Sequence, residues 1–124
     1  MTSRERAAAR IVELLDAPFL RALVEPARLE VFRALLTKGP SDVGEIAELL
    51  PQHRSVISRH LQTLEEAGIV HGTREGRHHV YAIDGGAFIA SLERILQEAR
   101  SLAAVCCPPS DVVPASRLRK RDQG

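Results

Sequence analysis

The sequence lacks the features that mark several classes of protein. It has only two cysteines, and because Cys106 and Cys107 are adjacent they cannot close a long loop, which excludes a secreted scaffold built on disulfides. Its apolar runs are a few residues long, whereas a helix needs ~20 apolar residues to cross a bilayer. No charged-then-apolar leader opens the chain. We therefore expect a cytoplasmic protein without a membrane partner.

Sequence motifs for catalysis are also missing. The chain has no glycine-rich loop of the kind that holds phosphate, and its cysteines do not have the Cys-x-x-Cys spacing of thiol reductases. No basic side chain that could activate a thiol lies near the two cysteines in the sequence. We predict that the chain is not an enzyme and requires no cofactor.

The composition that is present suits one packed domain with polar ends. The 124 residues are 44% hydrophobic and 27% charged, which is enough apolar content for a core. The net charge is only +1, but residues 1–10 and 114–124 are basic and the part between them is acidic. All five histidines lie between His53 and His79, together with several arginines. This region concentrates the side chains that could meet phosphate.

Hydrophobic spacing and proline positions predict that the first third of the chain is helical. One amphipathic helix covers residues 3–16 and is ended by Pro18, and a short helical piece follows at 19–24. Pro26 then opens a helix that runs to about residue 37. The residues expected to face inward on this helix are Leu29, Phe32, Leu35 and Leu36.

The next part of the chain has the pattern of two helices joined by a tight turn. Ser41 or Asp42 can cap a helix over residues 43–50, and residues 51–53 form the turn. Residues 54–67 form the second helix. Its inner face is expected to be Ile57, Leu61 and Leu64, and Gly68 supplies the left-handed residue after its last turn.

A β-hairpin and a long helix complete the predicted fold. Residues 69–74 and 77–83 read as strands around a turn at Glu75 and Gly76. The last helix spans residues 87–105, with Phe88, Leu92, Ile95, Ala99 and Leu102 at heptad spacing. The predicted fold class is therefore mainly α with a small β-hairpin wing, a winged helix-turn-helix that dimerises through its N- and C-terminal helices. The predicted segments are a dimerisation helix at 1–17, the winged helix-turn-helix with the C-terminal dimerisation helix at 18–105, and the cysteine pair with a disordered basic tail at 106–124.

The outer face of the second helix is polar, as a helix that reads the major groove requires. Arg59 suits a guanine base, because its planar guanidinium can donate two parallel hydrogen bonds, and Arg54 could do the same or hold phosphate. His60 is expected to meet the DNA backbone or a neighbouring helix. The full predicted DNA-binding set is Arg54, Ser55, Ser58, Arg59, His60, Gln62 and, beside the hairpin tip, Arg74 and Arg77. A two-fold dimer would place two such helices about 34 Å apart on an inverted-repeat operator.

Four stretches of the sequence resemble the ArsR/SmtB family of bacterial metalloregulatory repressors. They are the Pro26-Ala27-Arg28-Leu29 opening, Ser58-Arg59-His60-Leu61, Leu64-Glu65-Glu66-Ala67-Gly68 and Arg74-Glu75-Gly76-Arg77. The resemblance covers residues 16–105 and implies a homodimeric repressor that leaves its operator when an inducer binds. The chain departs from the family at two familiar metal sites. It has Asp42-Val43-Gly44 where many arsenic sensors have Cys-x-Cys, and its last helix has no His or Asp ligand.

The sensing site is therefore predicted at Cys106 and Cys107. Two adjacent thiolates can coordinate one soft ion, and trivalent arsenic or antimony is the best chemical match. Inorganic arsenite usually binds three thiolates, whereas a methylated arsenical has one valence filled by carbon and needs two, so the count favours an organoarsenical. Some members of the family resemble this chain in having such a C-terminal pair. Zinc fits less well because it takes four ligands.

Three other interpretations remain open from the sequence. The cysteines could form a redox-switched disulfide, or they could have no sensing role in a winged-helix repressor. The winged helix could also serve as a protein-interaction module rather than bind DNA.

Overall fold

The computed structural model describes residues 1–107, which form two compact units. Within the described residues, one unit comprises residues 15–93 and the other comprises residues 1–14 together with residues 94–107. The predicted basic tail, which includes Arg117 and Arg121, lies outside the described residues. Among the helices of the described chain, none is sufficiently long and apolar to span a membrane.

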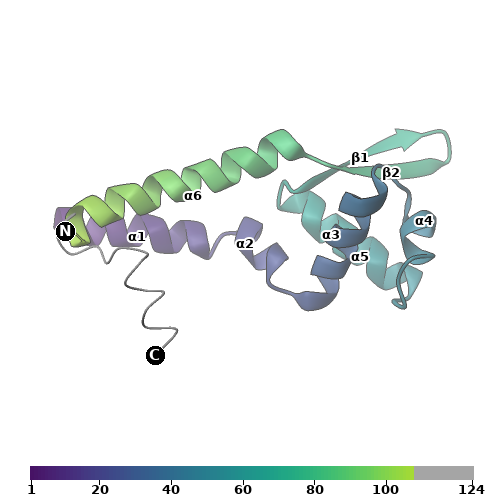
Figure 1. Ribbon diagram of the computed structural model, residues 1–124, viewed down its shortest axis with the longest axis horizontal. Coiled ribbons are helices and arrows are strands. Elements are labelled where there is room, and N and C mark those ends of the chain that lie inside the picture. Colours follow the sequence, from purple (N-terminus) through teal and green to yellow (C-terminus); the bar gives the residue numbers. More distant parts are fainter. Residues whose placement is uncertain (108–124) are drawn as a thin grey trace, which may run out of the picture. The chain divides into compact units, whose positions relative to one another are not determined.

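The structure confirms the predicted fold class, with helices predominating and one β-hairpin following a pair of helices joined by a turn (Figure 1). The elements in chain order are α1 (Ser3–Leu15), α2 (Pro18–Leu23), α3 (Pro26–Lys38), α4 (Val43–Ala47), α5 (Arg54–Glu66), β1 (Val70–Glu75), β2 (His78–Ile83) and α6 (Gly85–Cys106).

Local chemistry explains where the helices begin. A proline occupies the first position of α2 and of α3, where its missing N–H costs no hydrogen bond. The Glu25 side chain caps α3 by accepting from the backbone N–H groups of Ala27 and Arg28. Asp42 caps α4 in a reciprocal capping box with Glu45, which confirms one of the two predicted caps.

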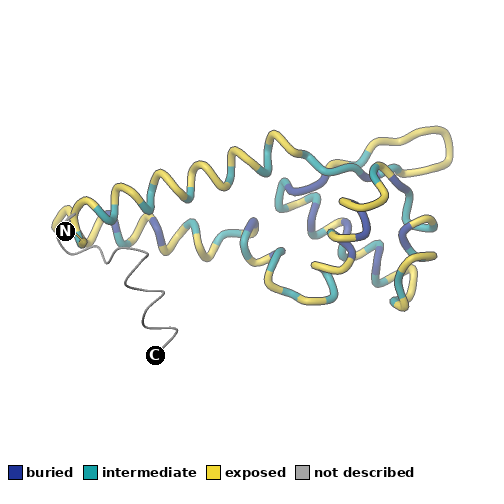
Figure 2. Tube along the Cα trace, in the orientation of Figure 1, coloured by how far each residue is buried: buried dark blue, intermediate teal, exposed yellow. Residues whose placement is uncertain are grey.

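The core of residues 15–93 forms where α3, α4, α5 and the hairpin meet (Figure 2). The largest fully buried apolar side chains in this core are Val31, Leu35, Ile46, Ile57, Leu61, Leu64, Ile69 and Val70. The predicted inner face of α5 is therefore confirmed. On α3 the prediction was partly wrong, because Leu29 and Leu36 are 39% and 56% exposed. Val31 lies about 200° around the helix axis from Leu29, and it is the Val31 face that packs inward.

Helix α4 is shorter than the predicted span of residues 43–50. It ends at Ala47 and gives way to turns before Pro51. A residue that precedes proline is disfavoured in helical conformation, which opposes extension of the helix through Leu50. Leu49 is half exposed, whereas Ile46 is fully buried.

The hairpin turn lies one residue later than predicted. Strand β1 pairs antiparallel with β2 from Val70↔Ile83 to Glu75↔His78, so the two-residue loop is Gly76-Arg77 rather than Glu75-Gly76. Gly76 has φ +64°, and no residue other than glycine has a positive φ in the described chain. A glycine with positive φ at the first loop position is typical of a type II′ turn. Ser41 extends the sheet by pairing its backbone with Tyr81.

In the second unit, α1 and the C-terminal part of α6 are linked by an ion pair. Arg10 Nε donates to Glu98 Oε2 at 3.0 Å, and Ala7 and Ile11 are buried one turn apart on α1. Helix α6 extends through Cys106, one residue beyond the predicted end. The interval of four residues from Leu102 therefore brings Cys106 onto the predicted heptad seam.

Candidate functional site

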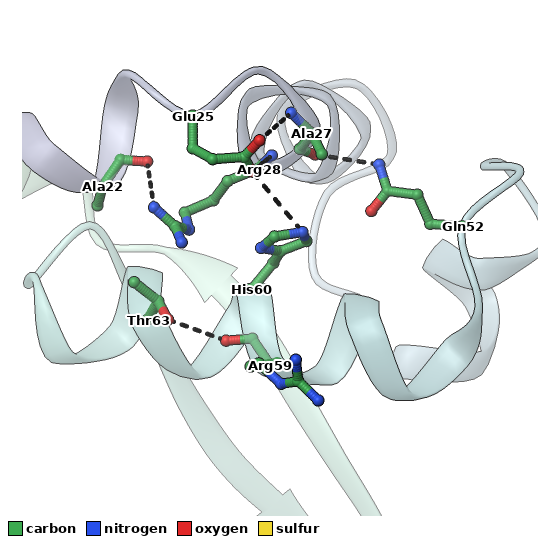
Figure 3. A network of polar contacts seen from close by, with 8 residues as sticks. All are labelled: Ala22, Glu25, Ala27, Arg28, Gln52, Arg59, His60 and Thr63. Atoms are coloured by element: carbon green, nitrogen blue, oxygen red, sulfur yellow. Dashed lines mark hydrogen bonds and ion pairs between the residues drawn. The ribbon is translucent and has the colours of Figure 1, made fainter.

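The outward face of α5 is a row of hydrogen-bond donors. Burial of Ile57, Leu61 and Leu64 fixes the rotation of the helix, so the side of α5 opposite these residues faces solvent. Arg59 is exposed, and Figure 3 shows its side chain directed away from α3. The predicted site residues that the structure places on the exposed or half-exposed surface of α5 are Arg54, Ser55, Ser58, Arg59 and Gln62.

A histidine that the sequence analysis did not assign caps this helix. His53 is the N-cap residue of α5, and its Nδ1 accepts the backbone N–H of Ser55 at 3.1 Å. The hydroxyl of Ser55 lies 2.8 Å from the same nitrogen. The cap defines the direction of the first turn of α5, where Arg54 and Ser55 lie. The position of His53 immediately before the helix could have indicated an N-cap, but histidine is not one of the common N-cap residues.

The turn before α5 is also fixed to α3. Gln52 Nε2 donates to the backbone carbonyl of Ala27 at 3.1 Å (Figure 3). Because Ala27 lies in the first turn of α3, this hydrogen bond joins the start of one core helix to the residues that lead into α5. Such a brace limits how far α5 can rotate relative to α3.

His60 faces α3, whereas Arg59 points away from that helix (Figure 3). Its side chain is 13% exposed, and its Nε2 is 3.8 Å from Oε2 of Glu25 at the start of α3 (Figure 3). Arg28, whose Nη1 donates to the carbonyl of Ala22, flanks the same contact. The structure thus places His60 against a neighbouring helix and apart from the other predicted DNA-binding residues.

Two pKa shifts follow from this arrangement. The pKa of His60 is lowered, chiefly because burial disfavours its charged form and also because Arg28 repels it. The pKa of Glu25 is lowered mainly by the N–H group of Ala27, with further contributions from Arg28 and His60. At neutral pH the α3–α5 contact therefore contains a neutral imidazole beside a carboxylate.

We expect His60 to make the stability of the protein pH-dependent. The unfolded chain protonates His60 near its ordinary pKa of about 6.5, whereas the folded protein resists protonation until a lower pH. The free energy of unfolding should therefore fall as the pH decreases from 7.5 through about 6.5 toward 5. In His60→Gln this fall should be shallower, as measured by urea denaturation at a series of pH values.

The exposed wing residue His71 offers the control for that experiment. His71→Gln should keep the pH dependence of the natural protein. Identical slopes for His60→Gln and the natural protein would show that His60 is not the group responsible.

The hairpin carries the other predicted cations. Arg74 is exposed near the end of β1, and Arg77 is exposed in the loop itself. Glu65 Oε2, on α5, accepts the backbone N–H of Gly72 at 2.6 Å. A Cβ at Gly72 would collide with the His79 imidazole, which stacks on the ring of Tyr81. The base of the wing is thus fixed to α5 by the Glu65–Gly72 hydrogen bond, a contact that the sequence did not predict.

The two cysteines lie at the end of α6. Cys106 is half-buried and Cys107 is exposed, and their Sγ atoms are 3.1 Å apart. This distance exceeds the ~2.05 Å of a disulfide, and it is short enough for one ion with sulfur bonds of about 2.3 Å to reach both atoms. The backbone N–H of Cys107 donates to the carbonyl of Ala103, so the helical hydrogen bonding continues into the pair.

Within residues 1–107, the metal-binding groups at this position are the two thiols. Among residues 1–107, the structure contains no group of three His, Cys, Asp or Glu side chains that could hold a metal ion. A ligand bound here would therefore be held by two thiolates, or would need a third donor from elsewhere. Two soft donors fit a thiophilic ion better than a hard cation.

Comparison with known proteins gives consistent matches. A family described as a helix-turn-helix domain matches residues 23–73. The HTH-type transcriptional regulator NmtR of Mycobacterium tuberculosis is 37% identical over 67 residues, which are 54% of this chain and 55% of NmtR. The chain thus spans about half the length of this curated relative.

Solved structures extend the similarity. An ArsR-like transcriptional regulator from Rhodococcus sp. RHA1 has 30% identity and a TM-score of 0.59, over 78% of this chain and 92% of that one. A protein described as a possible transcriptional regulator for arsenical resistance has 29% identity and a TM-score of 0.55, over 82% and 93%. The homodimeric winged helix-turn-helix domain of Mb0332 from Mycobacterium bovis has 25% identity and a TM-score of 0.54, over 85% and 91%. The names of these proteins describe transcriptional regulators, in agreement with the prediction that the chain is not an enzyme.

Proposed function

Because this chain belongs to the ArsR/SmtB family of winged helix-turn-helix regulators, we propose that it is a homodimeric repressor that binds double-stranded operator DNA and is released by a thiophilic inducer. The observation that carries the DNA-binding part is the exposed donor face of α5, which stands next to a wing with arginines at its tip. The rigid packing of α5 on its opposite side supplies the brace that a groove-reading helix needs.

The roles of the site residues follow from their chemistry and exposure. Arg59 reads a guanine in the major groove, and Arg54 at the helix start contacts a base or phosphate. Arg74 and Arg77 of the wing contact flanking phosphates or the minor groove. Ser55, Ser58 and Gln62 donate hydrogen bonds from the remaining exposed positions, while His60 holds α5 to α3.

Exposed apolar side chains on the terminal helices support a dimer. Val12 is 61% exposed on α1, and Ile89, Leu92 and Leu96 are 44–55% exposed on α6. No residue of α6 is buried within the described chain, although this helix has a heptad seam. A second copy would cover these exposed side chains, and two-fold symmetry would then require an inverted-repeat operator.

We assign the inducer site to Cys106 and Cys107, with a trivalent arsenical as the ligand. The paired Sγ atoms and the absence of a third ligand within residues 1–107 support a compound that needs two thiolates, such as a monomethyl arsenical. Helix α6 starts directly after the wing and ends at this pair. A ligand at Cys106 would alter the packing of the heptad seam between two subunits, and so change the distance between their two α5 helices.

The function is tested by fluorescence anisotropy of the reduced protein on duplex DNA from its own upstream region. Binding should weaken steeply with added salt, because phosphate contacts release counterions. A salt-insensitive interaction, or none, would favour a protein-interaction module. Titrations with arsenite, a monomethyl trivalent arsenical and zinc then identify the inducer class.

We expect the methylated arsenical to weaken DNA binding by about 5- to 150-fold, the usual range of allosteric coupling. Cys106→Ser and Cys107→Ser should each retain DNA affinity and lose this response, because a single thiolate cannot chelate. Ala104→Ser, an exposed change at the same end of α6, should respond like the natural protein.

Release that persists in both cysteine variants would contradict the assigned site. Release of the natural protein by oxidant alone, lost in the same variants, would instead identify a redox switch. Tight binding that no ligand alters would leave a repressor whose cysteines do not sense these compounds.

A further inference from the structure

One carboxylate links two segments that are distant in the sequence. Oδ1 of Asp42 accepts the backbone N–H of Glu45 at 2.8 Å, which caps α4. Its Oδ2 lies 2.9 Å from Nδ1 of His78, the first residue of β2. His78 is next to Arg77 in the wing loop, so this contact connects the tip of the hairpin to the start of α4.

The side chain of Arg54 approaches the same carboxylate from the start of α5. A Cβ at Gly44 would lie 3.6 Å from Cζ of Arg54 and 3.3 Å from Oδ1 of Asp42. The missing side chain of Gly44 therefore leaves a small space that the guanidinium and the carboxylate both border. The N–H of Glu45 is the main reason that the pKa of Asp42 is low, and the charges of His78 and Arg54 lower it further.

We propose that Asp42 is a positioning residue for DNA binding, which sets the wing tip relative to the first turn of α5 through His78 and Arg54. In this arrangement Arg77 and Arg54 meet one duplex at a fixed separation. The inference rests on the DNA-binding part of the proposed function. It assigns a role in DNA binding to a capping residue whose charge alone would oppose phosphate binding.

Charge alone predicts the opposite effect, which makes the proposal testable. A carboxylate near DNA-contacting arginines repels phosphate, so its neutralisation should strengthen binding if it has no positioning role. Loss of the contact to His78 should instead release the wing and weaken binding. The sign of the change therefore separates the two effects.

The variant for this test is Asp42→Asn, which keeps an oxygen to accept from Glu45 and removes the charge. Its matched control is Glu48→Gln, an exposed change of equal charge at the other end of α4. We expect Asp42→Asn to bind operator DNA about two- to fivefold more weakly, the scale of an exposed ion pair, and Glu48→Gln to bind equally or more tightly. Hydroxyl-radical footprints should lose protection at the wing contacts in Asp42→Asn alone.

A measurement without DNA tests the contact between Asp42 and His78 independently of the proposed function. Amide hydrogen exchange at residues 77 and 78 should be faster in Asp42→Asn than in the natural protein, and it should be unchanged in Glu48→Gln. The double variant that carries both Asp42→Asn and His78→Gln should exchange no faster than Asp42→Asn. If the natural protein binds no DNA, the proposed function fails while faster exchange would still support the wing contact. Equal exchange in the two single variants, or equal gains in their DNA affinity, would overturn the inference.

Discussion

Replacing Arg59 by alanine should weaken binding to the operator by about 1–3 kcal/mol and relax the base preference at one position. The side chain is exposed on α5 and directed away from the core (Figure 3). Its guanidinium can donate two hydrogen bonds to O6 and N7 of guanine, a pattern that no other base presents. Anisotropy measured on operators with each of the four bases at every position would locate the relaxed position.

Arg74→Ala is the comparison for this experiment. A phosphate contact carries no sequence information, so its loss should weaken binding uniformly and reduce the slope of the salt dependence by about 1. If Arg59→Ala produced the same uniform loss, Arg59 would be a phosphate contact and the base would be read elsewhere on α5.

Replacing Leu61 by alanine should lower the free energy of unfolding by about 2–5 kcal/mol. Leu61 is fully buried on the inner face of α5, so the shorter side chain loses apolar contacts and leaves a cavity. Urea denaturation followed by far-ultraviolet circular dichroism would measure the change. This loss is a large fraction of the total stability of a domain of this size.

Gln62→Ala changes the adjacent but exposed residue and should alter stability by no more than about 0.5 kcal/mol. A similar small effect for Leu61→Ala would mean that α5 is not held by its inner face. In that case Arg59 would have no fixed orientation from which to read DNA.

Helix α5 could be predicted from the sequence because its local and tertiary signals agree. Its apolar residues recur at helical spacing, and Gly68 has the positive φ expected after the last turn. On α3 the spacing of apolar residues is compatible with burial of either the Leu29 face or the Val31 face. Which face is buried depends on the elements that pack against the helix. Phe32 was expected to face inward, and it is half-buried and stacks on Phe88 of α6, a partner remote in sequence.

The wing shows a different source of error. Two registers of the hairpin place Gly76 in a two-residue loop, and they differ in whether glycine is the first or the second loop residue. Composition does not distinguish them, but the Ser41–Tyr81 pairing and the Glu65–Gly72 hydrogen bond fix the strands in one register. One consequence is that Arg77 belongs to the loop itself.

In the candidate site, too, features set by local sequence could be predicted and features set by tertiary contacts could not. Exposed arginines could be predicted from residue type and helical position alone. The contacts that orient them could not, because His60 with Glu25, Asp42 with His78 and Gln52 with Ala27 each join segments that only the tertiary structure brings together.

The cap at the start of α5 also specifies a tautomer. Nδ1 of His53 accepts the N–H of Ser55, so in the neutral ring the proton must be on Nε2. That N–H is then available as a donor at the N-terminal end of α5, which the proposed function places in the major groove, where backbone N–H groups already favour anions. The hydrogen bond from the Ser55 backbone thus orients the His53 ring, and the ring presents its Nε2–H donor at the start of α5.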